Sequence, residues 1–316
     1  TFRLGIISIK NLSFFQHGAG GQSFGYDQNG GCLDRCDPYG RRMELRPHSA
    51  SIICGGGKQK FTDEKWLKTR DGGLDKPLNI YEIHAGSWRC KPDEEDQRDV
   101  AEHWYNYREL ADLLVPYLKE NHYHYVEMMP LAEHPSDESW GYQISGFFSP
   151  TSRYGTPDDL KYLVNKCHNA GIGVIMDFVP VHFAVDDYAL WNFDGTALYE
   201  YPHSDVGKSE WGSCNFMHSR GEVRSFLQSA ADYWLEEFHF DGLRMDAISN
   251  LIYWQGNPAR GENKDAVQFL QNLNRGLKER FPTALLIAED STARPNITTP
   301  VSAGGLGFDY KWDMGG

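Results

Sequence analysis

Apolar residues recur along the chain with two alternating spacings from Leu78 onward. Short apolar runs predict buried strands at 78–84, 123–130, 172–180, 239–247, 284–290 and 307–314. The longer segments between them carry apolar residues every three or four positions, which predicts amphipathic helices at 107–121, 156–171, 221–238 and 264–282. This alternation predicts an α/β fold, a parallel sheet with its helices outside.

The number of predicted strands points to a barrel that is not complete. A closed (β/α)8 barrel has eight strands, and the chain carries about six. Residues 1–60 follow a different pattern, since they are rich in Gly and their apolar residues recur only over short periods. We interpret them as part of a small β module, joined to the barrel by a linker at 68–77.

Composition and charge narrow the possible partners and compartments. The net charge is −13, from 31 basic and 44 acidic residues, and no basic cluster stands out, so nucleic acid and anionic membranes are poor partners. The six cysteines form no CxxC pair and no zinc-like spacing, which favours reduced thiols in the cytoplasm. The apolar run at the start of the chain is too short for a signal peptide or a membrane span.

The stretch HFDGLRMDAIS, residues 239–249, places two opposite charges inside an apolar strand. Side chains alternate along a strand, so Arg244 and Asp246 point to the same side. Asp177 and Glu289 stand near the ends of the neighbouring strands, and Glu289 shares the parity of apolar residues before it. Active sites of (β/α) barrels lie at these carboxyl ends, so we expect the four charged groups to converge on one pocket.

Three carboxyl groups and one guanidinium in a pocket indicate acid–base and nucleophilic chemistry. A buried Arg lowers the pKa of an adjacent carboxyl and favours a nucleophilic carboxylate, while anionic neighbours keep a second acid protonated. Retaining glycosidases divide the work between two carboxyls in this way. Two other interpretations stay open. The Arg–Asp pair could simply hold two strands together, or Asp177, His182 and Glu289 could bind a cation, which the adjacent Arg244 disfavours.

Several segments resemble a known enzyme family. DFVPVH (177–182), GLRMDAIS (242–249) and AEDS (288–291) are similar to the first three signature regions of the α-amylase superfamily, glycoside hydrolase family 13. YEIHAGSWR (81–89) and SWGYQISGFFSPTSRYGTPDDLKYLV (139–164) narrow the resemblance to bacterial glycogen (1,4-α-glucan) branching enzymes. This resemblance runs from about Asp37 to the end of the chain. It implies that residues 1–75 are a remnant of a β-sandwich carbohydrate-binding-like module with its linker, and that 76–316 form the catalytic barrel.

The resemblance also implies a role for each matching residue. Asp246 would be the nucleophile and Glu289 the general acid/base. Asp177 and His182 would bind hydroxyls of the sugar in the cleavage subsite, and Tyr142 would stack on this sugar. Arg244 belongs to the same substrate-binding set and would orient and ionise Asp246. No cofactor or metal is implied. The expected partner is an α-1,4-glucan such as glycogen or amylose, and the expected full-length protein is a monomer.

The implied reaction transfers a glucan chain to a sugar 6-hydroxyl and creates an α-1,6 branch. Two alternatives stay open, a hydrolase of the same superfamily, such as an α-amylase or a maltooligosyl-trehalose hydrolase, and a non-catalytic glucan-binding fragment. The family's fourth region, with a third catalytic carboxylate, and its C-terminal β domain have no counterpart before Gly316. The expectation is therefore a truncated branching enzyme that is inactive alone.

Overall fold

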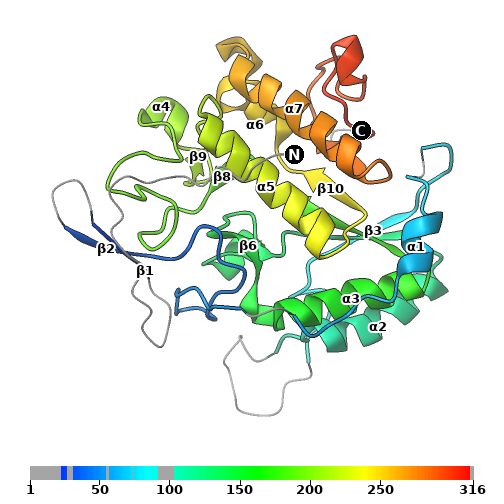
Figure 1. Cartoon of the computed structure of the whole chain (residues 1–316). Helices are drawn as coiled ribbons and strands as arrows, with labels where there is room; N and C mark the ends of the chain where they lie inside the picture. Colours follow the sequence, from blue (N-terminus) through cyan, green and yellow to red (C-terminus); the bar gives the residue numbers. More distant parts are fainter. Residues whose placement is uncertain (1–22, 27–30, 55–56, 73, 92–102, 314–316) are drawn as a thin grey trace.

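The computed structural model describes residues 23–26, 31–54, 57–72, 74–91 and 103–313 (Figure 1). The strands are β1 (Ser23–Tyr26), β2 (Cys32–Arg35), β3 (Ile80–Ile83), β4 (Tyr125–Met128), β5 (Ala132–Glu133), β6 (Gly146–Pro150), β7 (Gly173–Phe178), β8 (His182–Phe183), β9 (Cys214–Asn215), β10 (Gly242–Met245), β11 (Leu285–Glu289) and β12 (Tyr310–Trp312). The helices are α1 (Glu64–Thr69), α2 (Tyr107–Glu120), α3 (Pro157–Asn169), α4 (Ser204–Gly207), α5 (Gly221–Glu237), α6 (Ile248–Ile252) and α7 (Lys264–Arg280).

Six strands form one parallel sheet in the order β3, β4, β7, β10, β11, β12. Each strand therefore pairs with the next strand of this set along the chain, as in a (β/α) barrel. Helices α2, α3, α5 and α7 connect successive strands and surround the sheet in Figure 1. The predicted α/β fold, an incomplete barrel with about six strands, is confirmed for the described residues.

The two faces of the sheet bury different sets of side chains. The main core lies between the strands and the helices, and α5 alone contributes Phe226 and Trp234 to it. A second, smaller cluster lies on the inner face and contains the buried side chains of Tyr125, Ile175, Leu285 and Ile287. Both faces of the sheet are thus covered with apolar groups, which explains the nearly continuous apolar runs of the strands.

Local signals set the ends of α3. The hydroxyl of Thr156 accepts a hydrogen bond from the backbone N–H of Asp159, and the Asp159 carboxylate accepts one from the N–H of Thr156. Pro157 occupies the first helical position, where its missing N–H costs nothing. Gly171 follows the helix with φ of 79°, a left-handed conformation that glycine adopts without strain. These are the boundaries that the sequence predicts.

The long loop after β7, roughly residues 181–220, contains ordered structure that the sequence pattern does not reveal. β8 pairs with β9 within it, and α4 lies between them. Another hairpin, β5–β6, precedes α3. β5, β8 and β9 have two residues each and give no measurable alternation, so periodicity alone cannot predict these two hairpins.

A buried charge network holds α1 against the end of the barrel where the strands begin. The Asp241 carboxylate, which precedes β10, accepts hydrogen bonds from Trp66 Nε1, Arg70 Nη1, the Val174 amide and His168 Nε2 at 2.7 to 2.8 Å. The other imidazole nitrogen of His168 lies 2.7 Å from Asp63 Oδ2. Burial opposes a charged imidazole, but the two carboxylates outweigh it and raise the pKa of His168.

This network bears on the N-terminal part of the chain. Helix α1 covers residues that the sequence assigns in part to a linker, and it packs on the barrel through Trp66. In the N-terminal part, β1 pairs with β2, and Met43 forms an isolated antiparallel bridge with Ser51. The proposed division of the chain at residue 75 stays a prediction.

Other sequence-based interpretations concern residues beyond this description. The first ten residues, interpreted as too short a run for a signal peptide, and most of the Gly-rich 18–31 lie outside the described residues. All six cysteines are free thiols. Among the described residues, no helix combines the length and the apolar character that a membrane span requires. The cytoplasmic location and the monomeric state stay predictions.

We expect Asp241→Asn to destabilise the fold by about 3–5 kcal/mol, because it leaves buried charged partners uncompensated. Urea unfolding followed by circular dichroism measures this loss. The difference in unfolding free energy between Asp241→Asn and wild type should be larger at pH 6 than at pH 9. His168 has a raised pKa in the folded state, so its contribution is fully present below its unfolded pKa of about 6.5 and is lost as pH rises through the folded value.

The matched control is Asp205→Asn, which breaks an exposed ion pair with Arg260. Such pairs contribute about 0–1 kcal/mol. An equal, small effect of both substitutions would contradict the structural role of Asp241.

Candidate active site

The strand register brings Arg244 and two carboxylates together at the carboxyl ends of β7 and β10. Arg244 lies opposite Asp177 in the parallel ladder, so both side chains point to the inner face. Arg244 Nη1 donates hydrogen bonds to Oδ1 and Oδ2 of Asp177 at 2.8 and 2.9 Å, and to Oδ1 of Asp246 at 2.8 Å. One guanidinium nitrogen therefore links both carboxylates, and the convergence predicted from side-chain parity is confirmed for these three residues.

Burial sets the protonation of this group more strongly than the sequence suggests. It raises the pKa of Asp246 to about 6, although Arg244 acts in the opposite direction and Glu289 adds to the increase. It raises the pKa of Asp177 to about 7, again against the effect of Arg244. The expected lowering of the carboxylate pKa is therefore wrong for the net shift, because one cation serves two buried acids. At neutral pH, Asp246 is still mostly ionised.

Glu289 is joined to Asp246 through the backbone. Its Oε2 accepts a hydrogen bond of 2.7 Å from the N–H of Ala247, the residue that follows Asp246. Asp246 itself remains in the strand ladder, since its N–H donates to the Phe178 carbonyl at 2.9 Å. Ala247 then turns the chain into α6 with φ of 49°, an unusual left-handed conformation for a residue other than glycine. A single peptide unit thus fixes the two acids relative to each other.

Tyr142 and His182 approach from the loops. The Tyr142 hydroxyl donates a hydrogen bond of 2.6 Å to Asp177 Oδ2, and burial together with this carboxylate raises the pKa of the phenol. Burial lowers the pKa of His182 to about 4, so its imidazole is neutral at pH 7. In the described part of the chain, His182 Nδ1 is buried without a hydrogen-bond partner. A neutral imidazole has one donor and one acceptor nitrogen, the two functions that a sugar hydroxyl can match.

The structure adds residues that the sequence reasoning missed. Trp211 contacts His182, with ring centroids 5.3 Å apart. Trp312 of β12 lies 5.1 Å below the Arg244 guanidinium. Glu127 of β4 is fully buried, and burial next to Asp177 raises its pKa to about 9. Inward parity along β4 could have indicated Glu127, whereas nothing in the local pattern marks Trp211.

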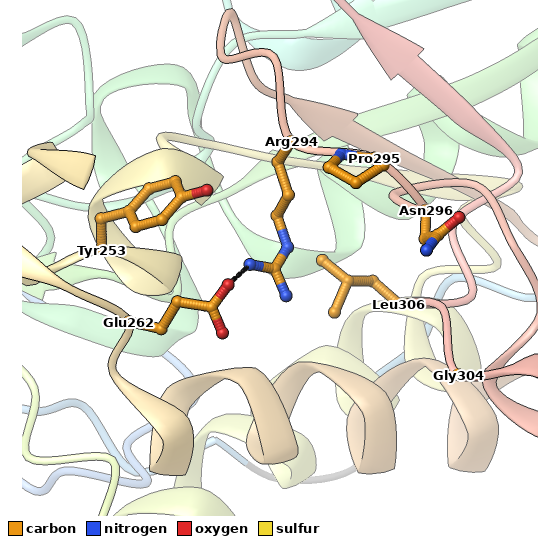
Figure 2. A pocket seen from close by; sticks show the side chains of 7 residues that line it. All are labelled: Tyr253, Glu262, Arg294, Pro295, Asn296, Gly304 and Leu306. Carbon is orange, nitrogen blue, oxygen red and sulfur yellow. Dashed lines mark hydrogen bonds and ion pairs between the residues drawn. The ribbon is translucent and has the colours of Figure 1, made fainter. Parts of the chain in front are cut away.

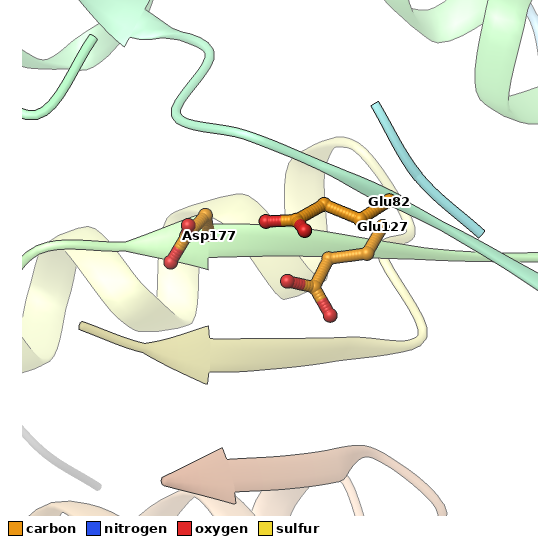
Figure 3. Close-up of side chains that lie close together, drawn as sticks. All are labelled: Glu82, Glu127 and Asp177. Carbon is orange, nitrogen blue, oxygen red and sulfur yellow. The ribbon is translucent and has the colours of Figure 1, made fainter. Parts of the chain in front are cut away.

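Glu82, Glu127 and Asp177 form an acidic cluster on the inner face of the sheet (Figure 3). Their nearest carboxylate oxygens lie within 4.8 Å of one another. A metal ion there would compete with Arg244, which already contacts both oxygens of Asp177. Glu127, with its raised pKa, is protonated at neutral pH and is a poor metal ligand. We therefore assign no metal to this cluster.

A pocket elsewhere is lined by residues from the loops around β11 and α6. Figure 2 shows Tyr253 and Glu262 on one side, Asn296, Gly304 and Leu306 on the other, and the Arg294 side chain between them. Arg294 and Glu262 form an ion pair there. None of the six sequence-predicted site residues lines this pocket, so it is separate from the charged group.

With this geometry in place, the chain can be compared with known proteins. The family model described as "Alpha amylase, catalytic domain" matches residues 113–197, which span α2 to the loop after β8. Relatives with 45–51% identity align over about nine tenths of the chain. The chain is thus similar to the α-amylase family over residues 113–197, and to these relatives over most of its length.

These relatives share one name. The "1,4-alpha-glucan branching enzyme GlgB" of Fusobacterium nucleatum is 51% identical over 281 residues, which cover 89% of this chain and 44% of the relative. The protein of the same name from Methylobacillus flagellatus is 47% identical over 301 residues, covering 91% of this chain and 40% of the relative. The chain thus spans less than half the length of these relatives.

Solved structures support the α-amylase fold. A putative α-amylase from Salmonella typhimurium superposes with a TM-score of 0.66 at 24% identity, covering 86% of this chain and 41% of that one. An α-amylase from Geobacillus thermoleovorans, solved with acarbose, gives a TM-score of 0.59 at 21% identity, covering 75% of this chain and 51% of that one. At these identities the likeness establishes the fold alone.

We expect the carboxyl carbon of Asp246 to titrate near pH 6, well above the value of about 3.9 typical of an exposed Asp. In Arg244→Met the apparent pKa values of Asp246 and Asp177 should both rise, because the cation that favours their ionised forms is gone. Carbon-13 NMR titration measures both values, with Asp246→Asn used for assignment. The two acids interact, so the midpoints belong to the pair.

The control for the loss of a guanidinium is Arg260→Met, which lies in an exposed ion pair. It should leave both midpoints unchanged. A wild-type midpoint near pH 4 for Asp246, or no rise in Arg244→Met, would show that Arg244 and burial do not set these values as described.

Proposed function

We propose that the chain carries the catalytic site of a 1,4-α-glucan branching enzyme. The observation that carries this proposal is the coupling of two carboxyl groups at one sheet edge. Asp246 is bound by Arg244, and Glu289 is hydrogen-bonded to the peptide that follows Asp246. The names of the curated relatives support the transferase over a hydrolase. Because the chain spans less than half of those relatives, the activity of a whole enzyme is part of the proposal.

In the first step, the Asp246 carboxylate attacks the anomeric carbon of an α-1,4-linked glucosyl unit. The bond between this carbon and the bridging oxygen breaks, and Glu289 protonates that oxygen. The product is a glycosyl ester of Asp246 and a shortened glucan. The Asp246 pKa of about 6 leaves a mostly ionised nucleophile at neutral pH.

In the second step, Glu289 acts as a base toward an acceptor. It takes the proton of a glucan 6-hydroxyl, whose oxygen attacks the anomeric carbon, and the Asp246 carboxylate leaves. Two inversions give net retention and an α-1,6 bond. Acceptance of a sugar hydroxyl in place of water distinguishes a branching enzyme from a hydrolase.

The remaining site residues hold the sugar in this proposal. Arg244 orients Asp246 and offsets part of the negative charge of Asp246 and Asp177. Asp177 and neutral His182 bind hydroxyl groups of the cleaved unit, and the Tyr142 ring stacks on it. The hydrogen bond from Tyr142 to Asp177 supports this arrangement, because it fixes the ring beside the carboxylate. We further propose that residues 1–75 are the remnant of a carbohydrate-binding-like module and its linker, and that 76–316 are the barrel.

The reaction class can be tested with amylose. We expect a chimeric protein, in which this chain replaces the matching segment of the Fusobacterium nucleatum relative, to lower iodine staining with little new reducing sugar. A debranching enzyme should then release short chains, and proton NMR should show new α-1,6 anomeric signals. If reducing ends increased in step with the loss of staining, and the product resisted debranching, the protein would be a hydrolase.

The roles of the two acids can be tested in the same chimeric protein. Asp246→Ala should abolish turnover, because no other group forms the covalent intermediate. Glu289→Gln should strongly lower the rate of reaction with glucans. It should lower the rate with substrates that carry activated leaving groups far less, since these need little proton donation.

Asp205→Asn, a surface carboxylate, serves as the control and should retain wild-type rates. More than a few per cent of activity in Asp246→Ala would refute the nucleophile assignment. Equal losses of Glu289→Gln on both substrate types would refute the proton-donor assignment.

A further inference from the structure

Trp211 is a large apolar side chain that the fold leaves exposed. Its exposed fraction is 45%, although the described residues bury most of their other aromatic rings. A lone exposed apolar residue is ordinary on a protein surface. Trp211 differs in two respects, the rigidity of the turn that presents it and the identity of its neighbours.

A tight turn of residues 208–214 holds Trp211 in place. Lys208 forms an antiparallel bridge with Cys214, and the Ser209 N–H donates to the Ser213 carbonyl at 2.9 Å. The Ser209 hydroxyl accepts a hydrogen bond from the Trp211 N–H at 3.2 Å and another from the Ser213 N–H at 3.1 Å. The indole therefore stands on a backbone that is already ordered before any ligand binds.

The neighbours of Trp211 belong to the candidate active site. Its ring lies against His182, with centroids 5.3 Å apart and an angle of 37° between the planes. Its carbonyl accepts a hydrogen bond of 2.9 Å from Gln143 Nε2. Gln143 directly follows Tyr142, whose hydroxyl bonds to Asp177. Trp211 is thus tied to both loops that flank the proposed sugar subsite.

We propose that the Trp211 indole is a stacking platform for a glucosyl unit of the α-1,4-glucan, next to the unit held by Asp177 and His182. This inference rests on the proposed function and extends it to a second subsite. The C–H face of a pyranose ring is flat and apolar, and an exposed indole offers it a matching surface while the sugar hydroxyls stay in water. Because the turn is rigid, binding loses little conformational entropy.

The charge of the protein disfavours an anionic ligand at this position. The net charge is −13, which disfavours polyanions. The nearest ring, His182, is neutral at pH 7 because burial lowers its pKa to about 4, so it offers no cation to an anionic group. An uncharged polyhydroxylated chain fits both conditions.

Calorimetric titration of the 316-residue chain with maltoheptaose tests the proposal. We expect Trp211→Ala to weaken binding by about tenfold, which corresponds to ~1.4 kcal/mol. Trp211→Phe should stay within about threefold of wild type, because a phenyl ring still stacks. The change in tryptophan fluorescence on binding should be smaller in Trp211→Phe than in wild type, while the calorimetric signal persists. The control is Arg260→Met, which removes an exposed ion pair with Asp205 and should bind as wild type does.

The outcomes separate the subsite from the proposed function. If wild type binds maltoheptaose and Trp211→Ala binds equally well, the subsite is refuted and the proposed function stands. If wild type binds no maltooligosaccharide, the subsite is refuted for this chain, and the amylose assay of the chimeric protein decides the proposed function. If Trp211→Ala unfolds at a lower temperature than wild type, the Trp211→Phe titration and its fluorescence decide, and a tenfold loss in that variant would also refute the subsite.

Discussion

The site depends on one guanidinium that two buried carboxylates share. Arg244 and Asp177 are both almost inaccessible to solvent, and an ion pair in such a place is tolerable only with good geometry. The parallel register supplies that geometry by placing the two residues opposite each other on adjacent strands. Asp246 shares the same nitrogen from the end of β10. The position of the proposed nucleophile therefore follows from the strand pairing of the barrel.

The inner face of the sheet changes character from the beginning of the strands to their ends. Tyr125, Ile175 and Leu285 form an apolar layer on the inner face. Acidic residues follow two positions later on β4 and β7, as Glu127 and Asp177, and four positions later on β11, as Glu289. The apolar layer anchors the strands, while the polar layer provides the chemistry. The same apolar surroundings raise the pKa values of the acids above them, so packing and reactivity are coupled in this fold.

The alternating pattern predicts the sheet, the main helices and the inward direction of Asp177, Arg244 and Glu289, because these depend on spacing along a single strand or helix. The pattern cannot predict properties that depend on contacts between residues far apart in the sequence. The net pKa of Asp246 depends on burial and on the sharing of Arg244 with Asp177, which no local segment records. Trp211 lies in a loop without periodicity, and only folding places it beside His182.

The peptide between Asp246 and Ala247 links the shape of the fold to the spacing of its acids. Ala247 bends the chain into α6, and its N–H also holds Glu289. A movement of α6 relative to the sheet would rotate this peptide and change the distance between nucleophile and proton donor at once. The α6 segment is therefore poorly suited to loop exchange or insertion during evolution, and new specificities in this scaffold are more accessible through the loop at 181–220.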